Sequence, residues 1–255
     1  MKDTRIIMGM PIEIEIGGGT QETLEAAFAY LTSVDERFSP YKATSEVSRM
    51  NRGEVAPEQV SSEMREVLAL AEKTKQETNG YFDIRTPSGG IDPSGIVKGW
   101  AILNTAKRIK SAGHDNYMVN AGGDIASGGM NEQGEEWRVG IRNPFKLEEI
   151  VKVVYPRGKG VATSGSYIRG AHIYNPHAPS EKLDEVVSIT VIGPDVLEAD
   201  RFATAAFAMG KGGINFIERL LGFEGYAIDQ HGLATLTSGF AEYAILKGNA
   251  TPRQE

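Results

Sequence analysis

Hydrophobic and polar residues alternate near the start of the chain and then change to a helical period. Between Pro11 and Ile16, isoleucine alternates with glutamate, which predicts a strand with one buried face. Thr20 follows, a residue type that often caps helix N-termini, and apolar residues then recur at helical spacing. These apolar residues are Leu24, Ala27, Phe28, Leu31, Val34 and Phe38. The chain therefore begins as a half-buried strand followed by an amphipathic helix.

The remaining pattern indicates an α+β fold, in which mixed or antiparallel sheets pack against helices. Helical periods predict helices at about 62–78, 94–112, 195–209 and 213–221. Strand patterns lie at 117–120, 137–141, 150–155, 186–192, 225–228 and 233–237. Helices come first and strands dominate the middle, which disfavours a regular βαβ succession. Because no linker divides the chain, we expect a single compact domain over residues 1–248 and a disordered tail over 249–255.

Composition limits the functions that are open to this chain. Its 255 residues include 27 basic and 34 acidic ones, giving a net charge of −7 with no basic cluster, so nucleic-acid binding is disfavoured. There is no cysteine, which excludes disulfides, thiol nucleophiles and thiolate metal sites. The first residues contain no apolar stretch long enough for a signal peptide and no lipid-anchor cysteine, and no segment approaches a membrane span. We therefore expect a cytoplasmic protein without stable membrane insertion.

The segment EADRFATAAFAMG at 198–210 contains the most informative candidate chemistry. A helix places Asp200 and Thr204 on one face, four positions apart, among alanines that leave room for a ligand. Hard oxygen atoms beside small side chains suit a magnesium ion that shares its coordination shell with a phosphate. The alternative is an ordinary core helix, in which Thr204 bonds to its own backbone and Asp200 is solvated.

The segment IDPSGIVKGW is a candidate anion site at the start of a helix. Asp92 and Ser94 are N-cap residue types, and Gly95 helps to shape a tight entry into the helix. Lys98 follows one turn later. The positive end of the helix dipole and N–H groups without intrahelical partners favour a phosphate at such a position. A capped surface helix with a solvated lysine is the competing interpretation.

Two further segments give weaker signals. In VNAGGDIASGG, Gly122 and Gly123 follow a strand and permit close approach of a phosphate, although a tight turn between strands explains them equally well. In VATSGSYIRGAHIYNP, Ser164 does not lie in a GxSxG sequence, so serine hydrolysis is not expected. His172 and His177 are too isolated to form a zinc site.

Together these segments resemble the FAD:protein FMN transferases, the ApbE-type flavin transferases. The matching motifs follow the family's order across roughly residues 8–210. They are MGM at 8–10, FSPYKATSEVSRMN at 38–51, GYFDIRT at 80–86, IDPSGIVKGW at 91–100, NAGGDI at 120–125, RVGIRNP at 138–144, ATSGSYIRG at 162–170, HIYNP at 172–176 and EADRFATAAFAMG at 198–210. Each motif is loose by itself, but their shared order is specific.

The resemblance implies an ApbE-like α+β fold that binds FAD in a cleft, with magnesium at the FAD pyrophosphate. Enzymes of this family transfer FMN from FAD to a Ser or Thr hydroxyl of an acceptor redox protein and release AMP. The acceptor carries a flavinylation motif, Asp-x-x-(Ser/Thr)-Gly-Ala. This chain lacks that motif, so self-flavinylation is not expected.

The resemblance also assigns roles to individual positions. The implied Mg²⁺ ligands are Asp200, Thr204 and the carbonyl of Gly95. The implied FAD contacts are Met8, Tyr41, Tyr81, Phe82, Asp83, Asp92, Lys98 and Ile173. His172 is the implied general base, since a neutral imidazole suits removal of a hydroxyl proton near neutral pH, and Asp200 is the next candidate. A structural strand histidine is the alternative role for His172.

One segment departs from the family pattern. Asn175 stands where the family has a carboxylate, and Ala178-Pro179 replaces Thr-Gly, which changes the local flavin contacts. Two other functions therefore remain open: a non-catalytic FAD-binding module or carrier, and an FAD pyrophosphatase that yields FMN and AMP. Retention of the metal and base residues favours the transferase, because a carrier needs no metal at the pyrophosphate.

Overall fold

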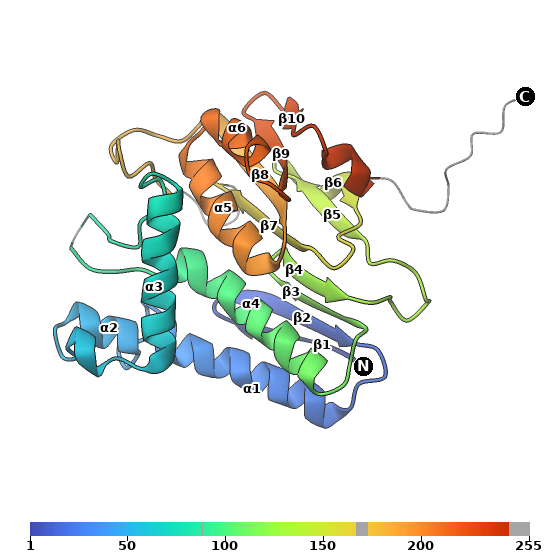
Figure 1. Ribbon diagram of the computed structural model, residues 1–255, viewed down its shortest axis with the longest axis horizontal. Helices are drawn as coiled ribbons and strands as arrows, with labels where there is room; N and C mark the ends of the chain where they lie inside the picture. Colours follow the sequence, from blue (N-terminus) through green and yellow to red (C-terminus); the bar gives the residue numbers. More distant parts are fainter. Residues whose placement is uncertain (88, 167–172, 245–255) are drawn as a thin grey trace, which may run out of the picture.

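The computed structural model describes residues 1–87, 89–166 and 173–244. Eight strands form one antiparallel sheet in the order β1-β2-β3-β4-β7-β8-β9-β10 (Figure 1). Their bounds are β1 Lys2–Ile7, β2 Met10–Ile16, β3 Tyr117–Ala121, β4 Asp124–Gly128, β7 Gly160–Gly165, β8 Val186–Gly193, β9 Glu224–Asp229 and β10 Ala234–Leu236. A separate antiparallel hairpin consists of β5 Val139–Asn143 and β6 Lys146–Val154. The expected α+β class with antiparallel sheets is confirmed.

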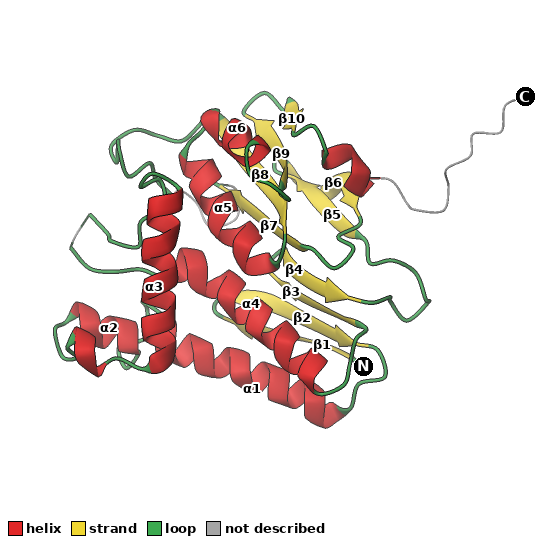
Figure 2. Cartoon of the chain, viewed as in Figure 1, coloured by secondary structure: helices red, strands yellow, loops and turns green. Residues whose placement is uncertain are grey.

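Helices cover one face of the large sheet (Figure 2), namely α1 Gln21–Phe38, α4 Ser94–Ser111, α5 Val196–Ala208 and α6 Gly212–Glu218. Two further helices pack against α1 and α4 beside the sheet, namely α2 Glu46–Asn51 and α3 Ser62–Glu77. Short 3-10 turns occupy Pro57–Gln59 and Phe240–Ala244. The predicted cap Thr20 accepts a hydrogen bond from the Thr23 backbone, so α1 begins where the sequence indicated. The tail expected at 249–255 lies outside the described residues.

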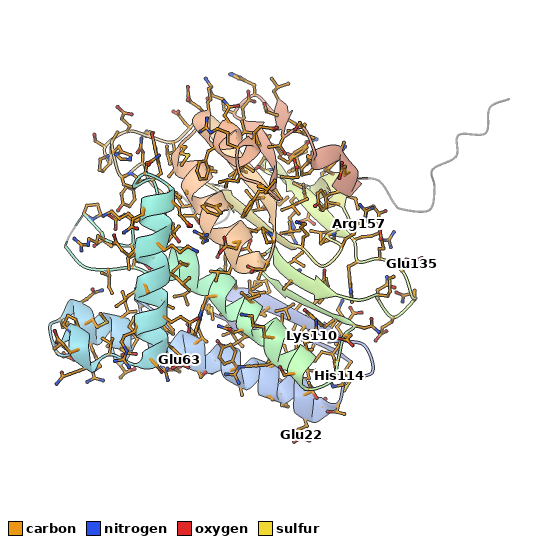
Figure 3. All side chains as sticks on the ribbon, viewed as in Figure 1. Glu22, Glu63, Lys110, His114, Glu135 and Arg157 are labelled. Atoms are coloured by element: carbon orange, nitrogen blue, oxygen red, sulfur yellow. The ribbon has the colours of Figure 1, made fainter. Side chains whose placement is uncertain are left out.

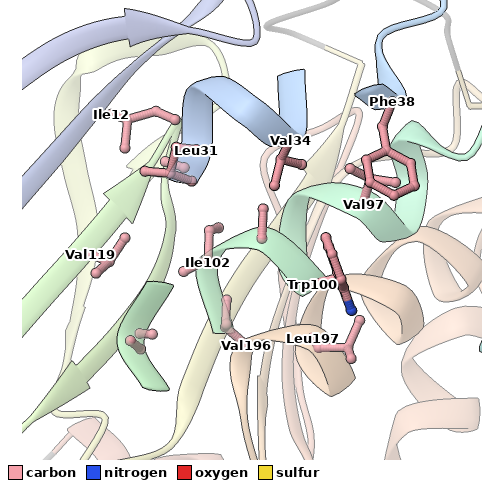
Figure 4. Packing of buried hydrophobic residues seen from close by; sticks show 14 of the residues in the cluster. Ile12, Leu31, Val34, Phe38, Val97, Trp100, Ile102, Val119, Val196 and Leu197 are labelled. Carbon is pink, nitrogen blue, oxygen red and sulfur yellow. The ribbon is translucent and has the colours of Figure 1, made fainter. Parts of the chain in front are cut away.

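The main core lies between the sheet and helices α1 and α4. Ile12, Ile14 and Ile16 of β2 are fully buried, as the alternation with glutamate predicted. Figure 4 shows Ile12 and Val119 from neighbouring strands on one side of the core, with buried residues of α1 and α4 packed nearby. In contrast, charged side chains such as Glu22 and Lys110 point outward (Figure 3).

Helix α4 packs against α1 and α3 on one side and against α5 on the other, which fixes its N-terminal half. On one side, the Trp100 ring meets Phe38 of α1 edge to face, with ring centroids 5.5 Å apart. The indole N–H of Trp100 donates to Glu66 of α3 over 2.9 Å. On the other side, α4 crosses α5 at Gly99, where an ideal Cβ would lie 3.0 Å from the Leu197 Cα atom. Glycine therefore sets the distance between the two helices that carry most of the predicted metal site.

Candidate active site

A cavity of about 1000 Å³ opens between the N-terminus of α4, helix α5 and the turn that joins β3 to β4. Most of the site residues expected from the sequence line it. They are Tyr81, Phe82, Asp83, Asp92, Gly95, Lys98, Ile173, Asp200 and Thr204. Residues from distant parts of the chain thus share one cavity of a size that suits a large organic ligand.

Asp200 is held in place by the backbone of the neighbouring helix. Its Oδ2 atom accepts a hydrogen bond from the Gly99 N–H over 2.8 Å. A Cβ at Gly99 would lie 2.8 Å from the Asp200 Cβ, so only glycine permits this approach. The side chain of Asp200 is 2% exposed. The alternative of a solvated Asp200 on an ordinary core helix is therefore wrong.

Lys98 lies between two buried carboxylates. Its Nζ atom is 2.5 Å from Asp124 Oδ2 and 3.3 Å from Asp200 Oδ1. Asp124 also accepts a hydrogen bond from the Thr163 backbone over 3.0 Å, which ties β4 to β7. Burial raises the pKa of Asp200 to about 7, while the Lys98 ammonium lowers it and the neighbouring Asp124 raises it. Lys98 is thus engaged in a buried charge cluster and is not the solvated surface lysine of the alternative interpretation.

Gly95 and Thr204 face each other beside Asp200. An ideal Cβ at Gly95 would lie 3.5 Å from the Thr204 methyl group and 3.2 Å from the Phe82 ring. The Thr204 hydroxyl lies 3.5 Å from the Ser164 hydroxyl. The helix start and the α5 face therefore bring the backbone of Gly95 close to the Thr204 side chain, on the same helix face as the Asp200 carboxylate.

This donor set fits magnesium, which prefers hard oxygen ligands and completes its shell with phosphate and water. Within residues 1–87, 89–166 and 173–244, no cluster of three or more His, Cys, Asp or Glu side chains could hold a metal. The proposed set has a single carboxylate and therefore is not such a cluster.

The start of α4 differs in detail from the sequence expectation. Pro93 occupies the N-cap position and makes no side-chain capping bond. Asp92 instead accepts a hydrogen bond from the Ser94 backbone over 3.0 Å. Ser94 is the first helical residue. The tight entry therefore comes from an Asp-Pro-Ser turn that orients the helix start toward the cavity.

An aromatic and apolar wall lies next to the helix start. Phe82 is almost fully buried, and the Tyr81 ring meets His177 edge to face with centroids 4.6 Å apart. The hydroxyl of Tyr174 donates to the Arg85 carbonyl over 3.0 Å. Ile173 lines the same cavity. Flat aromatic groups with few polar contacts suit a ring system such as a flavin.

The segment that departs from the family pattern is ordered by its own hydrogen bonds. The Asn175 side chain accepts from the His177 backbone over 2.9 Å. The Nε2 atom of His177 lies 2.9 Å from the Asn79 carbonyl oxygen. Asn175 therefore forms a local turn, and His177 braces Tyr81 of the cavity wall.

Two expected site residues do not line the cavity, and a third lies outside the described residues. Met8 lies in the turn between β1 and β2 with a φ of 54°, and its neighbours Gly9 and Met10 line the cavity instead. Tyr41 is 93% exposed and is not among the lining residues. His172 lies outside the described residues. The roles of these three residues remain predictions.

Asp124 is the residue that the sequence reasoning missed. It ends the NAGGD motif, for which the family resemblance implies no role of the aspartate. Gly122 and Gly123 form the two-residue turn between β3 and β4, with φ values of 62° and 105°. The turn interpretation is therefore correct, and the same turn lines the cavity. An acidic residue directly after a Gly-Gly turn was the available signal.

Comparison with solved structures shows which fold the chain has. The chain superimposes on "Flavin Transferase ApbE from Vibrio cholerae" with a TM-score of 0.81 and 23% identity, covering 95% of this chain and 98% of that one. The fold is therefore that of the ApbE-type flavin transferases. The model of the ApbE family matches residues 8–87 and 85–227, and the chain belongs to this family.

Curated relatives agree with this assignment. An FAD:protein FMN transferase of Escherichia coli is 32% identical over 166 residues, which cover 62% of this chain and 47% of that protein. One from Haemophilus influenzae is 25% identical over 255 residues, covering 75% of this chain and 74% of that protein. The match with the E. coli relative thus spans about half of that protein's length. No helix in the described part of the chain is both long and apolar enough to cross a membrane.

Proposed function

We propose that this protein transfers FMN from FAD to a Ser or Thr hydroxyl of an acceptor redox protein, in a magnesium-dependent reaction that releases AMP. The observation that carries the proposal is the buried cluster of Lys98, Asp124 and Asp200 at the cavity, beside the helix start at Gly95. Family membership and the names of the relatives support the same activity.

The reaction requires one bond to form and one to break. The acceptor hydroxyl oxygen bonds to the phosphorus atom of the FMN half of FAD. The bond from that phosphorus to the bridging oxygen breaks, and AMP leaves with this oxygen. The hydroxyl proton is released. Phosphoryl transfer of this kind depends mainly on positioning and on stabilisation of negative charge.

In this proposal, residues on the cavity wall position the FAD and stabilise the negative charge of its pyrophosphate. Asp200, Thr204 and the Gly95 carbonyl would hold Mg²⁺, which when bound neutralises charge on the pyrophosphate. Lys98 adds a cation whose position is fixed by Asp124. The proposed FAD contacts on this wall are Tyr81, Phe82, Asp83, Asp92 and Ile173. Met8 and Tyr41, which do not line the cavity, are proposed as FAD contacts on the family resemblance alone. The proposed base that accepts the hydroxyl proton is His172, on the strength of the family resemblance.

One experiment separates the transferase from the two alternatives. The protein is incubated with FAD, Mg²⁺ and an acceptor domain carrying the family's flavinylation motif, and the products are separated by chromatography. AMP together with FMN bound to the acceptor supports transfer. Free FMN with AMP identifies a pyrophosphatase, and uncleaved FAD that co-elutes with the protein identifies a carrier.

A further inference from the structure

The β5–β6 hairpin presents one face to the cavity and the other to the core. The pairing of Arg142 with Ile150 and of Gly140 with Val153 places these side chains on one face, together with Arg138. The alternate residues of β5, Val139 and Ile141, are buried in a core cluster below the hairpin. Leu147 lines the cavity beside Ile150. We call these side chains the hairpin face: Arg138, Arg142, Leu147, Ile150 and Val153.

The hairpin face combines exposed apolar side chains with two arginines, and it is continuous with the cavity. Leu147, Ile150 and Val153 are 44%, 51% and 41% exposed. Ile150 lies over Gly140, where a Cβ would approach its Cδ1 atom to 2.8 Å. Arg138, Arg142, Leu147 and Ile150 line the same cavity as Lys98. Exposed apolar side chains grouped at the rim of a cavity are typical of a surface that binds another molecule.

The two arginines of this face have no carboxylate partner in the part of the chain that the structure describes. Glu136, near Arg138 in sequence, pairs with Arg157. Glu149 of β6, near Arg142 in the hairpin, pairs with Lys146. Two such guanidinium groups on a chain with a net charge of −7 create a local positive site. A ligand with carboxylates complements this charge.

The hairpin face is also separated from the charge cluster that would handle the pyrophosphate. Asp124 points toward Lys98 on the helix side of β4. Its neighbour Ile125 packs with Val139 and Ile141 in the core cluster under the hairpin. Successive residues of a strand point to opposite faces, so the hairpin lies across the sheet from Lys98. The cavity therefore has one end lined by the Lys98 charge cluster and another end lined by the hairpin face.

We propose that the hairpin face docks the acceptor polypeptide, as a segment with acidic and apolar side chains near the hydroxyl that receives FMN. This inference rests on the proposed function, since flavin transfer requires a protein hydroxyl to enter the cavity. Because the face is continuous with the cavity, a docked segment can extend its hydroxyl from the hairpin end into the cavity that Lys98 also lines. The arginines select acidic residues, and Leu147, Ile150 and Val153 contact the apolar ones.

Binding of labelled peptides tests this directly and does not depend on turnover. The probes are two fluorescein-labelled decapeptides with one Thr and two Leu, in which the flanking residues are either Asp or Asn. Anisotropy is measured with the FAD-loaded protein in low salt. The parent protein should bind the Asp peptide, with an affinity that falls as salt rises, and the Asn peptide about tenfold more weakly.

Matched variants identify the surface. Arg142→Glu should weaken Asp-peptide binding by about tenfold and leave Asn-peptide binding nearly unchanged. Val153→Glu should weaken binding of both peptides. Lys152→Glu is the control, because it makes the same charge change on the same hairpin. Lys152 is paired with Ile141, whose side chain faces the core, so Lys152 does not belong to the hairpin face. This control should bind both peptides as the parent does.

Several results would overturn the docking proposal. The first is that the parent binds neither peptide. The second is that Arg142→Glu and Lys152→Glu change peptide binding equally. The third is that Arg142→Glu loses FAD affinity to the same extent as peptide affinity. A parent dimer that Val153→Glu dissociates in light scattering would assign the face to a second copy of the chain. The proposed function fails separately, if FMN and AMP are never formed from FAD while the peptides bind as expected.

Discussion

Gly99 offers the sharpest test of how the site is built, because its missing side chain sets the distance between α4 and α5. In Gly99→Ala, the new Cβ would lie 2.8 Å from the Asp200 Cβ and 3.0 Å from the Leu197 Cα. Overpacking of this kind costs about 1–3 kcal/mol, and the contact with backbone places the cost at the upper end. Alanine recovers about 1 kcal/mol through its better helix propensity. The expected net loss of stability is about 2 kcal/mol.

This loss can be converted into a shift of the unfolding temperature. An unfolding entropy of about 2.1 cal/mol/K per residue over the 255 residues gives roughly 0.5 kcal/mol/K. The melting temperature of Gly99→Ala should therefore fall by about 4 °C in a calorimetric or circular dichroism scan. Because the crossing also holds Asp200, Mg²⁺-dependent AMP release should fall with it.

Gly212→Ala is the matched control for this experiment. Gly212 begins α6, and an ideal Cβ there would meet nothing within 4 Å. The control should be neutral or more stable by up to about 1 kcal/mol, since alanine restricts the unfolded chain. A Gly99→Ala protein that melts at or above the temperature of Gly212→Ala would refute the reasoning about the helix crossing.

Three further substitutions test the site itself. Asp200→Asn keeps the shape but removes the charge, so it should abolish Mg²⁺-dependent turnover with a circular dichroism spectrum like that of the parent; full turnover would exclude Asp200 as a metal ligand. Lys98→Met leaves Asp124 and Asp200 without their cation and should lower the free energy of unfolding by about 3 kcal/mol, partly restored by Mg²⁺ in thermal melts. Equal melts with and without Mg²⁺ would contradict the proposed metal site. Tyr41→Ala should weaken FAD binding in flavin fluorescence titrations without Mg²⁺, and an unchanged affinity would remove this exposed residue from the proposed FAD contacts.

The sequence by itself determined the elements with a strong local pattern. The alternation of isoleucine and glutamate defined β2, and helical spacing with a capping residue defined α1, because burial of one face imposes these periods. The order of the motifs identified the family, and the spacing of Asp200 and Thr204 placed two metal-ligand candidates on one face of α5. These features depend on residues close together in the chain.

Tertiary structure alone decided which of these distant segments come into contact. Strands β4 and β7 are short and rich in small residues, so they have no strong period and are defined by pairing with their neighbours. The bond between Gly99 and Asp200 joins residues 101 positions apart, and Asp124 reaches the site only because a Gly-Gly turn reverses the chain beside α4. Such contacts depend on helix crossings and strand register, which arise from packing over the whole chain. For that reason the individual candidates could be predicted from the sequence, but the buried charge cluster and the hairpin face could not.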